Sequence, residues 1–563
     1  MESLVEKNNQ ITIAIIGGGI AGCTTALELA KQGYKVIIYE QDDDILQGTS
    51  ARTPGRLGLG YHYFHSETAE HYMKQTVEFM IKYSDCFIGN ESKPYLQHGR
   101  YFIVKDSLVD PQDLMASYDD VERKFEKIDP SRSIFGTSHL HRTLHKSEFK
   151  DDVNPEKVAF AFETEERLLD WKKFSAKLKD ELARNKNIKI KTKSRVDDLA
   201  MDESGQFIVK YKVDYLGTND FGQPVVKQNS VSEKVDSVVN CSWQNIEKIN
   251  ATLGIGDAHF KKDDPEQAMV SRLKLLAQIE IPKGCEEKHS MFFCVGPHAM
   301  FSNLGDGVGR VTFAPVTNFA ATPKVGMPAK FAKLMEDKNL IRDLRKQKDI
   351  PENADLTEQE EEDLVMEYLD KIIDRWLKYG LSEEEGEEYG QEIIDGAAEY
   401  MPWIKDAKLL KVIPGIVKSI GSVDIEDKNS SVHRRNYSGV EARQIGISEN
   451  AAMKLFYCLG NAKEMVEIIG KEMLAKYELR KIIDFAELDK LEHSSPEAKI
   501  NQKILGQFFI NHLQRNFQSD DLGEGKTKKI AEDLKVGVTN KGLVLREITQ
   551  LAPKIKERSS INE

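Results

Sequence analysis

The sequence lacks any uninterrupted apolar stretch of about 18 residues, which is the length that a transmembrane helix needs, so no membrane insertion is expected. Its first ten residues are polar and carry two glutamates. The apolar run at residues 11–16 therefore has no basic flank, and no signal peptide is expected. The six cysteines form no CxxC pair and no regular framework. This usage favours reduced, structural thiols and a cytoplasmic location.

Basic residues are also in short supply. The chain has 79 Lys and Arg against 92 Asp and Glu, which gives a formal charge of -13. Proteins that bind nucleic acid usually show the opposite balance, so duplex nucleic acid is not expected as a partner. No internal repeat is visible. The group His139, His141 and His145 has no acid-rich motif nearby, and no metal site is predicted.

What the sequence does contain is a strand, a glycine turn, a helix and a second strand near the N-terminus. Residues 11–16 and 34–39 are short β-branched apolar runs, as in strands buried on both faces of a parallel sheet, and residues 21–31 are compatible with a helix between them. The connecting turn reads GGGIAG and matches GxGxxG. In this motif the helix N-terminus and its free amides bind a pyrophosphate. The predicted dinucleotide contacts in the turn are Gly17, Gly19, Ile20, Ala21 and Gly22.

An acidic residue ends the second predicted strand. Glu40 stands where a carboxylate accepts hydrogen bonds from ribose hydroxyls and repels a ribose 2′-phosphate, and Gln41 follows it. An adenine dinucleotide other than NADP is therefore predicted.

The segment after Glu40 favours FAD. Residues 49–63, TSARTPGRLGLGYHY, are small, basic and glycine-rich, and too irregular for a helix. With the preceding motif they resemble the D-amino-acid oxidase-like superfamily of FAD oxidoreductases, and the layout is most similar to the L-2-hydroxyglutarate and glycerol-3-phosphate oxidase branch. The resemblance implies FAD as cofactor, with contacts from Thr49, Ser50 and Arg52.

Later segments resemble the same superfamily in the same order. Residues 166–171 resemble its hairpin leading to a helix, here to about residue 185, and residues 188–199 resemble the strand whose valine, Val196, touches the adenine side. Residues 236–243 resemble the strand end that carries Cys241, and residues 296–298 with 306–307 resemble substrate-sheet hairpins. An ordinary core valine and a small buried cysteine would look the same at these two positions.

The resemblance implies an α/β fold with a Rossmann-type FAD-binding domain of the glutathione-reductase-like kind, a mixed β-sheet substrate domain and added C-terminal helices. The FAD-binding parts are expected at residues 10–90, 161–260 and 401–480, and the substrate parts at 91–160 and 261–400. The second substrate part includes a helical acidic insertion, whose carboxylates we expect to be solvated rather than metal-bound. Residues 481–563 are expected to form a helical extension that binds a protein partner or mediates self-association.

A bound flavin would accept electrons, and the protein would position the donor. A carboxylate-bearing donor needs a cation, for which arginine offers a bidentate fork. The candidates are Arg272, Arg310, Arg434 and Arg435. The pair Arg434–Arg435 is preferred, because it lies in a polar stretch with His433, although arginines in an ordinary surface loop would look alike. Oxidation of an alcohol also needs a base, for which His298 or His433 is predicted.

Two positions depart from the superfamily pattern. Gly58 stands where a histidine is common, and His62 comes four residues later, so no base or flavin-link role is transferred to that position. Near the C-terminal end of the resemblance, Gly460 and Asn461 replace a glycine-rich loop. A helix starting there would still direct amides at flavin O2, and an ordinary helix cap is the alternative.

These observations predict an FAD-dependent oxidoreductase that oxidises a small 2-hydroxy acid, amine or amino acid by hydride transfer to flavin N5. Two alternatives stay open. One is a flavoprotein scaffold or redox sensor without efficient turnover. The other is an FAD-dependent monooxygenase, a class that also begins with GxGxxG but typically has a later GD motif.

Overall fold

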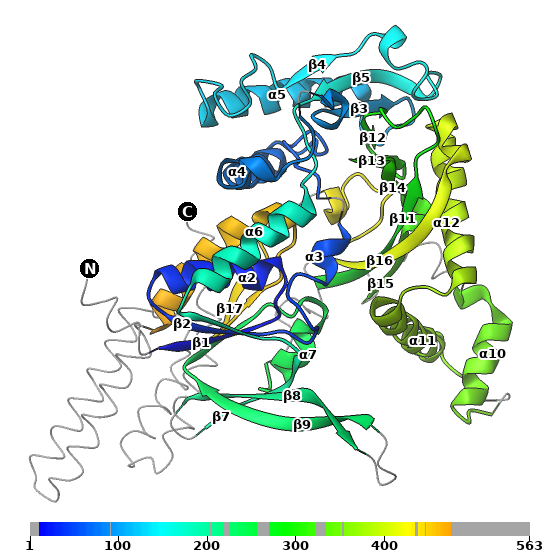
Figure 1. Ribbon diagram of the computed structural model, residues 1–563. Coiled ribbons are helices and arrows are strands. Elements are labelled where there is room, and N and C mark those ends of the chain that lie inside the picture. Colours follow the sequence, from blue (N-terminus) through cyan, green and yellow to red (C-terminus); the bar gives the residue numbers. More distant parts are fainter. Residues whose placement is uncertain are drawn as a thin grey trace, which may run out of the picture.

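The computed structural model describes residues 11–473, except residues 54, 91, 203–204, 219–223, 256–268, 323–333, 352–353, 434–436 and 445. The C-terminal extension expected at residues 481–563 lies outside the described residues. The chain forms two main sheets and a smaller third one (Figure 1). None of the helices in the described part is long and apolar enough to cross a membrane.

The first sheet has six strands in the order β17-β18-β10-β1-β2-β6. It is parallel except at its edge, where β17 runs antiparallel to β18. Its strands are β1 (Thr12–Ile16), β2 (Lys35–Tyr39), β6 (Ile188–Lys191), β10 (Ser237–Asn240), β17 (Val440–Gln444) and β18 (Ile447–Asn450). Four of the five residues of β1 are buried, as the apolar run predicts for a strand in the middle of a sheet.

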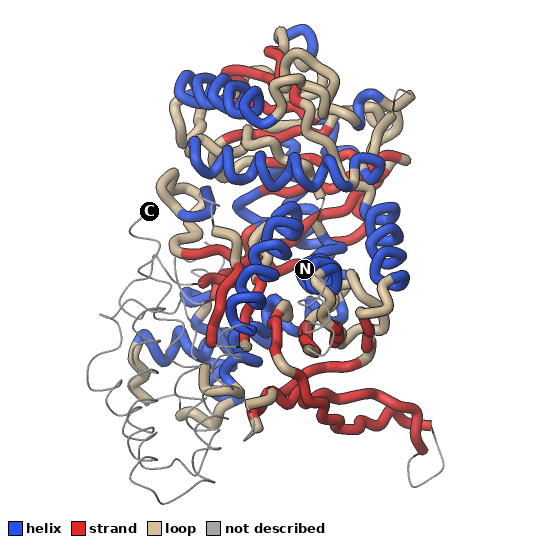
Figure 2. The backbone as a smooth tube through the Cα atoms, turned by 90° about the vertical axis from the view of Figure 1, so that its left-hand side faces the viewer, coloured by secondary structure: helices blue, strands red, loops and turns tan. Residues whose placement is uncertain are grey.

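Helices cover one face of this sheet and a small sheet covers the other. Helices α2 (Ile20–Lys31) and α6 (Trp171–Arg184) share a core with β1 and β2 (Figure 1). On the opposite face lie β7 (Ser194–Met201), β8 (Phe207–Thr218) and β9 (Pro224–Val235). The hairpin of β8 and β9 is the antiparallel excursion expected between residues 203 and 238, and β7 pairs with β8. The β8–β9 hairpin projects from the body of the molecule (Figure 2).

The second sheet has nine strands and is mixed. Its order is β15-β11-β14-β13-β12-β3-β5-β4, and β16 pairs with β11. Its strands are β3 (Gly99–Val104), β4 (His141–Thr143), β5 (Val158–Thr164), β11 (Met269–Glu280), β12 (Ser290–Cys294), β13 (Ala299–Gly305), β14 (Val308–Phe313), β15 (Asn318–Thr322) and β16 (Lys408–Ile420). The parallel and mixed sheets confirm the predicted fold class.

The remaining helices pack around this second sheet. One face is covered by the insertion, which comprises α10 (Lys338–Gln347), α11 (Glu358–Tyr379) and α12 (Glu383–Ala398). The insertion is helical and acidic as predicted, and it buries Val365, Leu369 and Trp376 against the sheet. Helices α4 (Ser66–Lys82) and α5 (Pro111–Ile128) contribute to the core on the other face. Leu59, Tyr61 and Tyr63, from the glycine-rich segment after Glu40, belong to the same core on that second face.

Candidate cofactor and substrate site

The glycine turn after β1 has the close contacts that the motif requires. Gly17 has a φ of 102°, and a Cβ atom there would lie 2.5 Å from the carbonyl oxygen of Cys241. A Cβ atom on Gly22 would lie 2.0 Å from the carbonyl oxygen of Gly17. Both positions therefore exclude a side chain for reasons of backbone packing. Cys241 is placed at the turn by its main chain.

The N-terminus of α2 has an open approach to its first amides. Its N-cap, Gly19, provides no side-chain cap, and the amide of Ile20 donates to Ser50 Oγ at 3.1 Å. A Cβ atom on Gly19 would meet a single heavy atom within 4 Å, that same hydroxyl oxygen at 3.5 Å. The space in front of the first amides is thus free of backbone, and the positive end of the helix dipole faces it. The structure brings Gly19, Ile20 and Ser50 together, and their contact with a cofactor stays a prediction.

The predicted ribose acid lies beside this turn. Glu40 Oε2 accepts a hydrogen bond from the amide of Gly18 at 2.7 Å, and its Oε1 accepts one from the amide of Asp42 at 2.9 Å. Burial raises the pKa of the Glu40 carboxyl, and the bonds from Asp42 and Gly18 oppose that rise. Gln41 follows directly, at the end of β2. The carboxylate is therefore held at the edge of the sheet where a ribose would lie.

The segment after Glu40 differs from the expected irregular loop, because Thr49–Arg52 forms one helical turn, α3. Thr49 begins this turn. Arg52 donates through Nη1 to the carbonyl of Pro414 at 3.2 Å and through Nη2 to the carbonyl of Leu377 at 3.0 Å. These contacts join α3 to β16 and α11. The guanidinium proposed to contact flavin is thus bonded to β16 of the nine-stranded sheet, which lies within the expected FAD-binding part at residues 401–480, and to α11 of the helical insertion.

At three other predicted cofactor residues, contacts within the protein account for the residue type. Val196 is 8% exposed and lies in the core beneath β1. Asn461, in the helix at residues 458–473, donates through Nδ2 to the carbonyl of Ser438 at 2.8 Å and to Asn450 Oδ1 at 2.9 Å. A Cβ atom on Gly460 would lie 2.0 Å from Gln75 Oε1. Core packing accounts for Val196, hydrogen bonds account for Asn461, and the nearby Gln75 leaves no room for a side chain at position 460, so contact of these residues with FAD stays a prediction.

The face of the nine-stranded sheet away from α12 carries a cation without a counter-ion. Arg310 of β14 donates through Nη1 to the carbonyl of Thr53 at 2.6 Å, and its Nε has no hydrogen-bond partner. Burial alone lowers its pKa, and no carboxylate in the described part of the chain forms an ion pair with it. Thr312, two residues along the same face, has a buried hydroxyl without a partner. A buried charge is costly unless it is paired.

A second arginine on this face was not assigned a role from the sequence. Arg56 lies between the glycine-rich segment and the sheet, and it contacts the buried carboxylate of Glu166 and the hydroxyl of Tyr101. Residues 56 and 166 are far apart in the chain, so spacing could not join them. The feature of the sequence that could have indicated a role for Arg56 is a lone arginine inside a run of glycine and leucine.

The two histidines proposed as bases lie on different sides of the sheet. His433 is 8% exposed and close to His62, whose pKa is lowered well below its usual value by burial and by the charges of Arg56, Lys454 and His433. His62 Nδ1 lies 3.8 Å from Cys294 Sγ on the face of Arg56. The preferred anion pair, Arg434 and Arg435, lies outside the described residues.

His298 is on the face covered by α12. Its Nδ1 lies 2.9 Å from the Tyr400 hydroxyl, and Tyr400 also packs against Phe293 at a ring distance of 4.9 Å. Since neighbouring residues of a strand point to opposite faces, Phe292 and Cys294 face the other way. The structure therefore does not bring His298 together with Arg56 and Arg310.

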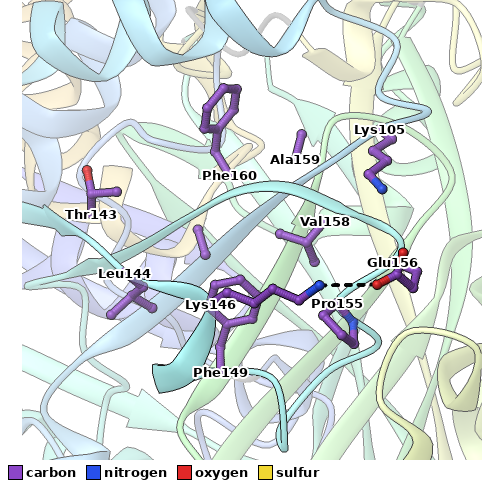
Figure 3. Close-up of a pocket in the computed structure, with 11 residues that line it drawn as sticks. Lys105, Thr143, Leu144, Lys146, Phe149, Pro155, Glu156, Val158, Ala159 and Phe160 are labelled. Carbon is purple, nitrogen blue, oxygen red and sulfur yellow. Dashed lines mark hydrogen bonds and ion pairs between the residues drawn. The ribbon is translucent and has the colours of Figure 1, made fainter.

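A shallow hollow of about 240 Å³ lies elsewhere, at the β4–β5 edge of the sheet (Figure 3). Lys146 and Glu156 form an ion pair of 3.1 Å across it. It is lined by Lys105, Thr143, Leu144, Lys146, Phe149, Pro155, Glu156, Val158, Ala159, Phe160 and Ala161. None of these residues belongs to the glycine turn or to β14, which carries Arg310. Among the described residues, no group of three or more His, Cys, Asp or Glu could hold a metal ion.

Comparison with known proteins agrees with the cofactor motif. A family model, DAO, described as FAD dependent oxidoreductase, matches residues 12–253. The curated FAD-dependent monooxygenase kojA of Aspergillus flavus is 41% identical over 91 residues, which are 16% of this chain and 21% of that protein. The bifunctional tRNA-modifying protein MnmC of Shewanella frigidimarina is 49% identical over 53 residues, 9% of this chain and 8% of that protein. The chain thus matches about a fifth or less of these relatives.

Two solved structures are similar over most of the chain. L-proline dehydrogenase from P. horikoshii has a TM-score of 0.48 and 15% identity, and the match covers 81% of this chain and 92% of that one. Glycine oxidase from Geobacillus kaustophilus has a TM-score of 0.47 and 13% identity, with 82% and 94% covered.

Proposed function

Because residues 12–253 are those of a DAO-family FAD-dependent oxidoreductase, with FAD as cofactor, we propose that the protein oxidises a small organic donor at the face of Arg310. The donor class is a 2-hydroxy acid, an amine or an amino acid, and a hydride leaves its carbon for flavin N5. FAD supplies the electron-accepting chemistry when bound. The residues of this chain bind, orient and deprotonate the donor.

The turn after β1 fits the pyrophosphate of FAD. Gly17 and Gly22 allow the close backbone approaches, and Gly19 leaves the helix N-terminus open. Glu40 would bind the ribose hydroxyls, and its negative charge disfavours a 2′-phosphate. Ser50, already bonded to the amide of Ile20, lies where it would share the phosphate contacts.

The observation that carries the donor class is the state of Arg310. Its guanidinium is buried enough for its pKa to fall, yet among the described residues it forms a hydrogen bond only with the carbonyl of Thr53. A buried charge is costly unless it is paired. A donor carboxylate would supply the missing charge through a charge-assisted hydrogen bond to Nε. Thr312 provides a neighbouring hydroxyl for the same ligand.

Proton removal from a hydroxy donor also needs a base. His433 stays the candidate, because it lies near His62 on the side of Arg56. Burial, and then the positive charges of Arg56 and Lys454, hold the pKa of His62 well below its usual value, which favours it as a hydrogen-bond acceptor. An amine donor would lose its proton before binding and would need less help.

The test is an anaerobic reduction experiment with the FAD-loaded protein. Pools of 2-hydroxy acids, amino acids and N-methylated amines are added separately, and the visible flavin band is followed. Bleaching by one pool is expected and identifies the donor class. A flavin that binds but is bleached by none of the pools would replace this proposal with the scaffold or redox sensor.

A monooxygenase is the second candidate, supported by the 41% identity to kojA over 91 residues. The experiment above separates it from the first. Flavin bleached by NADH or NADPH, but by none of the donor pools, would favour the monooxygenase.

A further inference from the structure

The outer edge of the small sheet has no neighbouring strand in the described part of the chain. The strand order β7-β8-β9 places β9 at this edge. All 12 residues of β9 pair with β8, in unbroken register from Pro224 to Val235. A strand without a bulge keeps its outer N–H and C=O groups in one regular row, with which another strand can pair.

The other sheet edges among the described residues are short, interrupted or covered. The strands β4, β6, β15 and β17 have three to five residues each, and β7 contains a register shift. The long edge strand β16 contains Pro414, whose carbonyl accepts a hydrogen bond from Arg52, and the carbonyl of Ile416 accepts one from Trp243. Proteins use such devices to prevent edge-to-edge pairing. The edge of β9 is long and regular by comparison.

The outer face of β9 is exposed and carries little charge. Ser230, Ser232 and Lys234 lie on this face and are exposed, whereas Glu233 lies on the other face and contacts β6. The ammonium group of Lys234 is already paired with Asp202 at 2.7 Å. The chain as a whole has a formal charge of -13, so two copies repel each other in general. Contact through this edge adds no pair of opposed carboxylates on the outer face.

The hairpin also extends beyond its third strand. β7 pairs with β8 only as far as residue 213, whereas β8 and β9 stay paired out to residues 218 and 224. This distal part is a ribbon of two strands that projects from the body of the molecule (Figure 2). A two-stranded ribbon is marginally stable in water, and a further strand stabilises it. The hairpin therefore gains stability from a neighbouring strand.

From these observations we propose that β9 pairs antiparallel with β9 of a second copy of this chain about a two-fold axis. The two small sheets then form one continuous sheet, centred on residues 229–234. A two-fold contact is closed, so it ends at a dimer instead of growing into a fibre. Two short strands bury less than the roughly 1,200 Å² of a stable interface, so the dimer is weak. None of residues 229–234 is assigned to the cofactor or the donor, and the inference does not depend on the proposed function.

Sedimentation equilibrium of the full-length, FAD-loaded protein tests this proposal. We expect a monomer–dimer equilibrium with a dissociation constant of about 1 to 100 μM. The variant Ser230→Lys/Ser232→Lys places like charges opposite each other, because paired residues of the two copies lie on the same face of the joined sheet. Its dissociation constant should be higher than that of the wild type by about 10-fold or more.

The matched control is Ala176→Lys/Ala183→Lys, which adds the same charge at two exposed positions of α6. Its dissociation constant should agree with that of the wild type within about 2-fold. If the variant at Ser230 and Ser232 does not fold, amide hydrogen exchange of the wild type decides. The outward amides of residues 229–234 should exchange more slowly at a protein concentration of about 100 μM than at about 1 μM.

Three results would overturn the assignment. The first is a monomer throughout this concentration range, the second is a dimer that the lysines at positions 230 and 232 leave unchanged, and the third is exchange of residues 229–234 that is independent of concentration. A monomer with these amides protected at every concentration would show that another segment of the same chain covers the edge.

Discussion

The alanine variant of Gly19 gives the sharpest test of the cofactor site, because the structure separates its effect on folding from its effect on binding. Gly19 has a φ of -71°, which alanine adopts without strain, and its Cβ atom would meet only Ser50 Oγ at 3.5 Å. The free energy of unfolding of the FAD-free protein should therefore change by no more than about 0.5 kcal/mol. The added methyl group, however, would occupy the approach of the pyrophosphate to the helix amides.

The expected loss of affinity follows from the bonds that this methyl group blocks. A charge-assisted hydrogen bond contributes about 1.5 to 3 kcal/mol, so losing one weakens FAD binding by about 10- to 100-fold. Titration of FAD-free protein, followed by flavin fluorescence, measures the dissociation constant. Thermal unfolding of the same FAD-free sample measures stability.

Two other glycines calibrate the result. Gly17→Ala meets a φ of 102° and a carbonyl oxygen at 2.5 Å, so backbone strain and overpacking should cost about 2 to 6 kcal/mol of stability. Gly48→Ala has no heavy atom within 4 Å and should change neither quantity. The reasoning is refuted if Gly19→Ala binds FAD as the wild type does, or if it loses as much stability as Gly17→Ala.

Three further predictions concern the surrounding structure. Arg52→Gln removes the hydrogen bonds to the carbonyls of Pro414 and Leu377. Amide hydrogen exchange should therefore become faster at the C-terminal end of α11. Unchanged exchange there would contradict the contact. Leu369 lies in the core between α11 and the sheet, so Leu369→Ala should lower the free energy of unfolding by about 2 to 5 kcal/mol, measured in urea titrations. A change below about 1 kcal/mol would mean that the insertion is not part of that core. The pKa of His289 is lowered to about 4, mainly by burial. Between about pH 6.5 and pH 4 this histidine is therefore protonated in the unfolded chain but not in the folded protein, so the free energy of unfolding falls as the pH falls. His289→Asn should flatten this part of the curve of melting temperature against pH, and a curve identical to that of the wild type would contradict the shift.

The cofactor half of the site could be predicted from the sequence because its signals are local. Gly17, Gly19, Gly22 and Glu40 belong to one strand-turn-helix-strand unit, in which backbone geometry dictates residue type. Hydrophobic periodicity likewise identified the excursion between residues 203 and 238 and the helical insertion. These features depend on a few residues at fixed spacing, so a single sequence reveals them.

The substrate half could not be predicted in the same way. Whether a histidine faces the site or the α12 core depends on which side of a strand it lies, and His298 lies on the core side. Arg52 was expected at the flavin, but carbonyls of β16 and α11, more than 300 residues away in the chain, engage it. The pairing of Arg56 with Glu166 likewise arises only when the hairpin folds back on the glycine-rich segment.

The central claim is that Arg310 binds the acid group of a donor that reduces the flavin. The most direct measurement compares the rate of anaerobic flavin bleaching in wild type, Arg310→Gln and a control variant, Arg142→Gln. Arg142 lies in β4 at the edge of the nine-stranded sheet, where it pairs with Glu148 and Glu163. The substrates are the donor found in the pools and its uncharged amide. We expect the acid to reduce the wild type and the control equally fast, and Arg310→Gln at least about 10-fold more slowly at a subsaturating concentration, with the amide poor in all three. Equal rates for the acid in all three FAD-loaded proteins would contradict the account.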